Sequence, residues 1–236
     1  MPNEDHTMHL VVANKLYSSW SLRPWILMRA LDIPFTDETI PMYQPDSKAR
    51  MLAKGPTGKC PVLIDGDVTV WESLAIIEYV AEKFPAKAVW PADAKARAHA
   101  RAASNEMHAG FQPLRQKCPM NLRARFAYRD RGPEVAQSQA RVEGLWREAR
   151  ARFGANAGGP FLYGAFCAAD AMFAPVVTRL DTYQLPVAAD TRAYMDAVLA
   201  HPAFVAWRSD ALAEPSAWNI YDQYEQGETA VEVFKT

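Results

Sequence analysis

Three serines surround a tryptophan in the run Ser18-Ser19-Trp20-Ser21, at the start of the first expected helix. Serine is a preferred helix N-cap, so one role for these hydroxyls is to accept hydrogen bonds from the first N–H groups of the helix. The alternative role is that one hydroxyl donates a hydrogen bond to a bound thiolate. A free thiol has a pKa near ~8.5, so a hydroxyl donor and a helix N-terminus would both favour its ionised form. The residues alone leave both roles open.

A second polar pair, Glu72 and Ser73, follows a short hairpin. Residues 62–64 are an apolar run, the next two residues are an Asp-Gly turn signal, and residues 68–71 are a β-rich return strand. We expect Ser73 to cap the helix that follows, because its apolar residues recur with helical spacing. Glu72 and Ser73 would then lie at a helix N-terminus, which favours a bound anion. With nothing bound, the same pattern is a hairpin packed on a helix.

A proline, Pro61, opens the first strand of this hairpin. Proline lacks an N–H, so Cys60 before it keeps unpaired backbone groups at an open edge of the sheet. A cis peptide bond is possible at such a step, but the residue types do not decide it.

The elements that hold these residues follow a mixed α/β pattern over residues 8–84. Residues 8–13 are expected to form a buried strand, and the serine run leads into a helix through about residue 31. A second strand at 35–40 and a short helix at 45–52 precede the hairpin and its helix. The order β-α-β-α-β-β-α has a crossover unit followed by a hairpin unit, as in a thioredoxin-like fold.

Beyond a linker between Pro85 and Pro91, strand signals almost vanish and helical patterns take over. Residues 168–183 are apolar nearly all round, which predicts a buried helix at the centre of an all-helical domain. The expected helices of this domain lie at residues 95–117, 135–153, 168–183, 191–199 and 202–212.

Composition and charge exclude several classes of function. The chain has 236 residues, of which half are hydrophobic, and a net charge of −1, so no basic face for nucleic acid is expected. The three cysteines are far apart without CxxC spacing, so we expect neither a disulfide framework nor a metal site. We expect the protein to lie in the cytoplasm, where thiols stay reduced. No run approaches ~18 apolar residues, so neither a membrane span nor a signal peptide is expected.

Together these motifs resemble the cytosolic glutathione transferases, over nearly the whole chain. Residues 59–84 resemble the second half of their thioredoxin-like domain, with a cis-proline after Cys60 and with the Glu72-Ser73 pair that holds the γ-glutamyl end of glutathione. The serine run is similar to the SSC motif of the zeta class, whose first serine activates the thiol. The resemblance therefore implies that Ser18 is the thiol-activating residue.

The same resemblance implies a glutathione-binding set: Ser19, Lys59, Cys60, Pro61, Glu72 and Ser73. Cys60 would bind the cysteinyl part through its backbone. Glu72 would take the γ-glutamyl amine, and Ser73 the adjacent carboxylate. Lys59 would either meet the glycine carboxylate or be a solvated loop lysine. Ser19, one residue further into the turn than Ser18, is expected to cap the helix.

Two positions depart from the family pattern. Zeta-class and beta-class members have a cysteine where this chain has Trp20, so disulfide exchange at this site would have no protein nucleophile. Trp20 would either wall the site or pack on the core. Family members also carry Ser/Thr-x-x-Asp as a capping box of the central helix, where this chain has Cys167. A thiol is a weak acceptor, but Asp170 is expected to bond back to the Cys167 N–H.

The resemblance places the pocket for the second substrate between the domains, along the first long helix of the helical domain. Asn105, His108 and Phe111 lie within one to two turns of that helix, and Arg115 lies one turn further on. With Trp20, they are the candidate lining of this electrophile pocket. A histidine such as His108 more commonly packs in the fold or at an interface than acts as a general acid.

We therefore predict a thioredoxin-like glutathione-binding domain at residues 1–85, a linker at 86–92, an all-helical domain with the electrophile pocket at 93–213, and a tail at 214–236 over the domain interface. The expected reaction is addition of the glutathione thiolate to a small electrophile, by a cytoplasmic homodimer acting in detoxification without a metal. Two alternatives stay open. One is a glutathione-dependent isomerase, like maleylacetoacetate isomerase, and the other is a non-enzymatic ligand-binding protein of the same fold.

Overall fold

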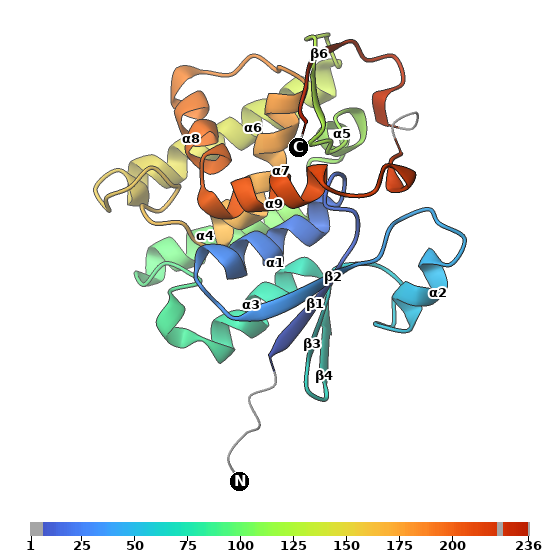
Figure 1. The fold of residues 1–236 in the computed structure, drawn as a ribbon. Coiled ribbons are helices and arrows are strands. Elements are labelled where there is room, and N and C mark those ends of the chain that lie inside the picture. The colour runs from blue at the N-terminus through green and yellow to red at the C-terminus, as the bar shows by residue number, and fades with distance from the viewer. Residues whose placement is uncertain (1–6, 221–223, 236) are drawn as a thin grey trace.

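A four-stranded sheet with helices forms the first part of the chain in the computed structural model, which describes residues 7–220 and 224–235 (Figure 1). The strands lie in the order β2-β1-β3-β4, with β1 parallel to β2 and antiparallel to β3. Their bounds are β1 Met8–Val12, β2 Phe35–Thr39, β3 Val62–Asp65 and β4 Val68–Trp71, and the helices between and after them are α1 Ser19–Ala30, α2 Ser47–Leu52 and α3 Ser73–Lys83. This is the predicted thioredoxin-like arrangement. Residues 1–6 of the predicted first domain and 221–223 and 236 of the predicted tail lie outside the described residues.

The central strand β1 is apolar on both sides because both faces of the sheet are covered. Leu10 and Val12 point into the main core, whereas Val11 packs with Val62 and Met51 in a small second core under α2. Alternate residues of a strand point to opposite faces, so a continuous apolar run is the pattern that such a strand requires.

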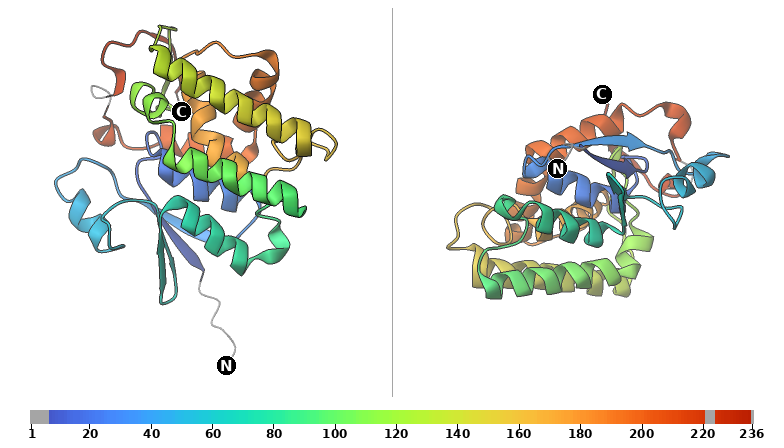
Figure 2. Two further views of the ribbon diagram at one scale, coloured as in Figure 1. Left: turned by 180° about the vertical axis from the view of Figure 1, so that it is seen from behind. Right: turned by 90° about the horizontal axis from the view of Figure 1, so that it is seen from below.

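The second part of the chain is mainly helical and shares one hydrophobic core with the first. Its helices are α4 Ala94–Ala109, α5 Gln112–Lys117, α6 Pro133–Ala149, α7 Ala168–Thr182, α8 Ala189–Leu199 and α9 Pro202–Leu212. Every residue of α7 is buried, as its apolar pattern predicts, and the helix packs against both α1 and α4. Figure 2 shows α4 and α6 running side by side on the face turned away from the viewer in Figure 1.

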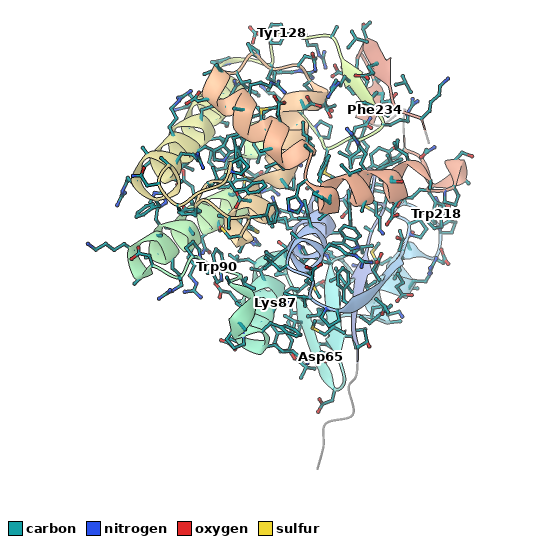
Figure 3. All side chains as sticks on the ribbon, turned by 60° about the vertical axis from the view of Figure 1, so that its left-hand side comes forward. Asp65, Lys87, Trp90, Tyr128, Trp218 and Phe234 are labelled. Atoms are coloured by element: carbon teal, nitrogen blue, oxygen red, sulfur yellow. The ribbon has the colours of Figure 1, made fainter. Side chains whose placement is uncertain are left out.

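The linker between the two parts, where Figure 3 labels Lys87 and Trp90, forms hydrogen bonds to both of them. Trp90 is buried and its indole Nε1 donates a hydrogen bond to Glu78 of α3 at 3.1 Å. The carbonyl of Val89 accepts from the N–H of Ala168 at 2.8 Å, at the start of α7. The capping box of α7 is present, and Asp170 accepts from the Cys167 N–H at 2.9 Å, as expected.

The single helix predicted at residues 95–117 is wrong, because the chain breaks between α4 and α5. Gly110 ends α4 in an extended conformation, and a Cβ there would lie 2.7 Å from the carbonyl oxygen of Glu106. Phe111 then takes a left-handed φ of 59°. Pro113 is in the first turn of α5, where its missing N–H removes no hydrogen bond. Arg115 therefore belongs to a separate helix whose direction the sequence did not predict.

The helical part predicted at residues 93–213 also contains one short strand, which pairs with a strand of the tail and which the sequence did not predict. The short strands β5 Ala124–Phe126 and β6 Ala230–Val233 pair in antiparallel fashion. This pairing fixes the end of the chain to the helical part, where Arg123 also pairs with Glu225 at 2.9 Å. The preceding tail segment reaches the first part of the chain, where the Asn14 amide donates to the Trp218 carbonyl at 3.3 Å.

Candidate active site

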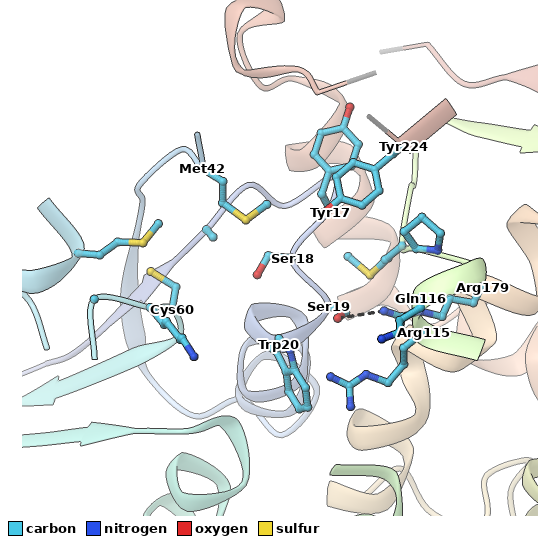
Figure 4. Close-up of a pocket in the computed structure, with 16 residues that line it drawn as sticks. Tyr17, Ser18, Ser19, Trp20, Met42, Cys60, Arg115, Gln116, Arg179 and Tyr224 are labelled. Atoms are coloured by element: carbon cyan, nitrogen blue, oxygen red, sulfur yellow. Dashed lines mark hydrogen bonds between the residues drawn. The ribbon is translucent and has the colours of Figure 1, made fainter. Parts of the chain in front are cut away.

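Two adjoining cavities lie between the loops of the sheet and the helices of the second part. The larger has a volume of about 560 Å³ and the smaller about 340 Å³. Trp20, Lys59, Cys60 and Arg115 line both, so the two form one cleft. Ser18, Ser19 and Arg179 line the larger cavity, which Figure 4 shows, while Glu72, Ser73 and His108 line the smaller.

Ser18 is the residue that caps α1. Its Oγ accepts from the Ser21 N–H at 3.4 Å, and its hydroxyl donates to the Ser21 Oγ at 2.8 Å. The Ser21 Oγ in turn accepts from the Ala13 N–H at 3.0 Å. The prediction that Ser19 caps the helix is wrong, because its Oγ accepts from Arg179 Nη2 at 3.2 Å. In Figure 4, Ser18 points toward the side of the cavity that Cys60 lines, whereas Ser19 points toward Arg179.

The peptide bond between Cys60 and Pro61 is cis, as the resemblance implied. The Cys60 side chain is half-buried, and this burial, together with the nearby Glu38 carboxylate, raises the pKa of its thiol to about 12. Cys60 is therefore protonated at neutral pH and is a poor nucleophile. What it can offer a ligand is its backbone.

Glu72 and Ser73 form the start of α3 in a way that differs from the prediction. Glu72 is the N-cap, with a left-handed φ of 69°, and Ser73 is the first helical residue rather than the cap. A left-handed φ in a residue other than glycine costs on the order of 1–3 kcal/mol and is found at binding and catalytic sites more often than elsewhere. Here it directs the Glu72 carboxylate, which is 58% exposed, into the smaller cavity.

The Ser73 hydroxyl is buried and has no hydrogen-bond partner among the described residues. A buried polar group usually has a hydrogen-bond partner, so a hydroxyl without one in a cavity wall is suited to bind a polar group of a ligand. The first-turn N–H groups of α3 lie at the same place. A hydroxyl and free N–H groups suit a carboxylate, and the Glu72 carboxylate beside them suits an ammonium group.

His108 faces Glu72 across the smaller cavity, with 3.9 Å between its Nε2 and the carboxylate. Burial and the positive charge of Arg23 lower the pKa of His108 below its usual value, against a smaller opposing effect of Glu72. The imidazole is therefore mainly neutral at pH 7. Its ring packs edge-on against Trp20, with 5.1 Å between ring centroids.

Trp20 walls the cleft and is held between two guanidinium groups. Arg23 lies 4.0 Å and Arg115 4.5 Å from the centroid of its ring. Arg23 is fully buried and donates from Nε to the Met172 carbonyl at 3.1 Å. Arg23, Arg115 and Arg179 form a cluster of three arginines. Of these, only Arg115 was predicted from the sequence. A cationic residue inside the otherwise buried helix at 168–183 was the signal for Arg179.

The remaining predicted pocket residues lie elsewhere. Asn105 lines neither cavity, and its amide bonds back to the Arg101 carbonyl at 3.0 Å on α4. Phe111 lines neither cavity because the break between α4 and α5 packs its ring against the core. Lys59 is exposed at the rim of both cavities. Tyr224, which the sequence analysis did not assign, comes from the tail, lines the larger cavity and stacks on Tyr17 at 5.3 Å.

Within residues 7–220 and 224–235, no cluster of three His, Cys, Asp or Glu side chains is arranged to hold a metal ion. No helix in the part of the chain that the structure describes has both the length and the apolar character needed to cross a membrane.

A family model described as "Glutathione S-transferase, N-terminal domain" matches residues 17–83. A protein of Caenorhabditis elegans described as "Probable maleylacetoacetate isomerase" is 36% identical over 104 residues, which are 42% of this chain and 48% of that protein. "Glutathione S-transferase zeta class" of Euphorbia esula is 28% identical over 114 residues, 46% of this chain and 50% of that protein. The matched segment thus spans about half the length of these relatives.

Among solved structures, a glutathione transferase homologue from Burkholderia with bound glutathione superposes with a TM-score of 0.65 at 22% identity. It covers 88% of this chain and 100% of its own. Such a likeness establishes the fold, and the sequence matches agree with the resemblance to the zeta class. The chain is therefore similar to the N-terminal domain of the glutathione S-transferases at residues 17–83, and it has the fold of a solved glutathione transferase homologue over most of its length.

Proposed function

We propose that this protein is a glutathione transferase, which adds the thiolate of glutathione to an electrophilic carbon of a small molecule. The observation that carries this proposal is the start of α3. There the buried Ser73 hydroxyl lacks a partner among the described residues, and the exposed Glu72 carboxylate lies beside it. An α-amino acid end, with one ammonium and one carboxylate, fits both groups at once, and the γ-glutamyl end of glutathione is such a group.

In this proposal, glutathione runs from the start of α3 to the start of α1. Its cysteinyl backbone pairs with the backbone of Cys60, at the cis bond to Pro61. Lys59, a cation at the rim, is assigned to the glycine carboxylate. The sulfur then reaches the larger cavity, where the Ser18 hydroxyl points toward the Cys60 side.

Ser18 acts in this mechanism as the donor to the sulfur. In the structure its proton goes to the Ser21 Oγ, 2.8 Å away. When glutathione binds, this proton turns to the sulfur, and the Ser21 hydroxyl donates to the Ser18 Oγ in its place. Each hydroxyl then donates one hydrogen bond and accepts at least one. The hydrogen bond and the N-terminus of α1 stabilise the thiolate over the thiol.

The reaction then needs only that the electrophilic carbon be positioned against the sulfur. The sulfur lone pair forms an S–C bond, and either a leaving group departs with its electron pair or the π electrons of an activated alkene move to a neighbouring carbonyl and are protonated. No oxidant is consumed. A further role for Cys60 as a nucleophile is not part of this proposal, because its thiol remains protonated at neutral pH.

A second candidate function is glutathione-dependent isomerisation, favoured by the relative described as a probable maleylacetoacetate isomerase. An isomerase would use the same glutathione site but release glutathione unchanged. Trp20, at the position where the zeta class has cysteine, favours conjugation. We further infer a homodimer that works in detoxification in the cytoplasm, as the family does.

The test is an electrophile panel with two readouts on each reaction: loss of free thiol and loss of the electrophile. Conjugation consumes the two in equal amounts and produces a species with the summed mass. Substrate loss without thiol loss would establish the isomerase instead. Glutathione binding without turnover of any electrophile would favour the non-enzymatic ligand-binding protein.

A further inference from the structure

The larger cavity carries more positive charge than the proposed glutathione site requires. Arg179 and Arg115 both line it, and Arg23 lies behind Trp20. The two carboxylates of glutathione are assigned to the start of α3, in the smaller cavity, and to Lys59, at the rim of both cavities. Arg115 lines both cavities, whereas Arg179 lines the larger cavity and not the smaller one, and it donates to the Ser19 hydroxyl there (Figure 4).

The charges of these arginines are not balanced within the described part of the chain. No carboxylate is among the described residues that line the larger cavity. Arg179 is only 4% exposed, donates only to the Pro175 carbonyl and the Ser19 hydroxyl, and its Nε has no described partner. Arg115 bonds only weakly to backbone carbonyls, at 3.4 and 3.5 Å. Charged side chains are seldom buried unless they are paired.

Burial, followed by repulsion from Arg115, lowers the pKa of Arg179 to about 10, so that it still carries its charge at neutral pH. Because no described carboxylate offsets these charges, the described part of the cavity favours the entry of an anion. A carboxylate fits best, because the planar guanidinium offers parallel donors that match its two oxygens.

We propose that Arg179 and Arg115 bind a carboxylate on the second substrate, so that the preferred electrophiles of this enzyme are organic acids with an apolar body. This inference rests on the proposed glutathione transferase function. The apolar body would lie along Met120 and the stacked Tyr17 and Tyr224 rings, which line the same cavity. The reacting carbon would lie between the arginines and the sulfur at Ser18. For an unsaturated acid, the thiolate adds to the alkene carbon, the π electrons move to the activating carbonyl, and a proton from water completes the product.

The test uses a matched pair of unreactive probes, 3-phenylpropanoate and its neutral amide, titrated calorimetrically into the protein with and without saturating glutathione. We expect the acid to bind at least ~10-fold more tightly than the amide, since hydrogen bonds to charged groups are the stronger ones. Arg115→Gln and Arg179→Gln should each reduce this preference ~10-fold without changing affinity for the amide. Arg97→Gln, a charge removal on α4 outside both cavities, should leave it unchanged.

Equal binding of acid and amide to the parent protein would overturn the inference, and so would an acid preference that survives in both variants. Arg179 is buried, so a melt checks that its variant is folded. If it is not, the partly exposed Arg115 decides the question alone. Glutathione is titrated into the same samples. Loss of glutathione binding with the acid preference intact would refute the proposed function but not the arginine site.

Discussion

Replacing Ser18 by alanine tests how the protein would ionise glutathione. The change removes the hydroxyl that lies 2.8 Å from Ser21 Oγ and that we assign as the donor to the sulfur. It leaves the start of α3 intact, so both ends of the tripeptide keep their partners. We therefore expect glutathione affinity to change little and the pKa of the bound thiol to rise.

The magnitude follows from one hydrogen bond to a charged group, which is worth ~1.5–3 kcal/mol. Since one pKa unit corresponds to ~1.4 kcal/mol, the bound thiol should ionise at least ~1 unit higher. Below that pKa, each unit lowers the thiolate fraction, and with it turnover near neutral pH, ~10-fold. Ser18 is also the N-cap of α1, so the variant should lose up to ~1 kcal/mol of stability. The 3.4 Å bond from the Ser21 N–H places this loss at the lower end.

The assay is the thiolate absorbance of the protein–glutathione complex, titrated against pH in the parent, Ser18→Ala and Ser19→Ala. Ser19 is the matched control because its hydroxyl accepts from Arg179 and does not cap the helix. We expect an upward shift in Ser18→Ala alone. A shift in Ser19→Ala without one in Ser18→Ala would transfer the role to Ser19. No shift in either would leave the N-terminus of α1 as the sole activator.

Three further predictions concern redox activity, a helix cap and the tail. Reduction of a glutathione mixed disulfide should be negligible, because burial keeps Cys60 protonated, and robust activity abolished by Cys60→Ser would contradict this. Cys167→Ser should stabilise the fold by a few tenths up to ~1 kcal/mol in denaturant melts, since a hydroxyl is the better cap of α7, and a loss above ~2 kcal/mol would contradict the capping role. Burial raises the pKa of Glu214 to about 7, so its proton is held in the native state and released from the unfolded chain between about pH 4.5 and 7. Stability should therefore fall as the pH rises through that range, and Glu214→Gln should flatten the dependence; an unchanged slope would exclude this residue.

Local signals predicted the residues to which we assign ligand binding through the backbone and the helix ends. The Asp-Gly turn, the strand-opening Pro61 and the serine run each act within a few residues, so their elements were predicted within one or two positions. Local signals did not predict which residue caps α1 and which caps α3. Serine is an acceptable cap at both helices. At α1, Ser18 rather than Ser19 is the cap, and the Ser19 hydroxyl instead bonds to Arg179, which is 160 residues away in the sequence. At α3, Glu72 with its left-handed φ takes the cap position in place of Ser73.

Features made by distant segments were missed for the same reason. The strands β5 and β6 are too short to show alternation, and each is stabilised by a partner about a hundred residues away. The break at Gly110 lies within a run of good helix formers, where one glycine does not exclude a helix. The arginine cluster joins α1, α5 and α7, and a single arginine on each gave no local pattern.

The most direct test of the central claim is calorimetric titration of glutathione into the parent protein, Glu72→Ala and Ser73→Ala. The parent should bind, and each variant should lose ~1–3 kcal/mol of binding free energy, because each leaves one charged end of the ligand without its partner. Glu82→Ala, which removes an exposed carboxylate near the other end of α3, should bind like the parent. If both Glu72→Ala and Ser73→Ala also bind glutathione like the parent, the site at the start of α3 is not where this protein holds glutathione.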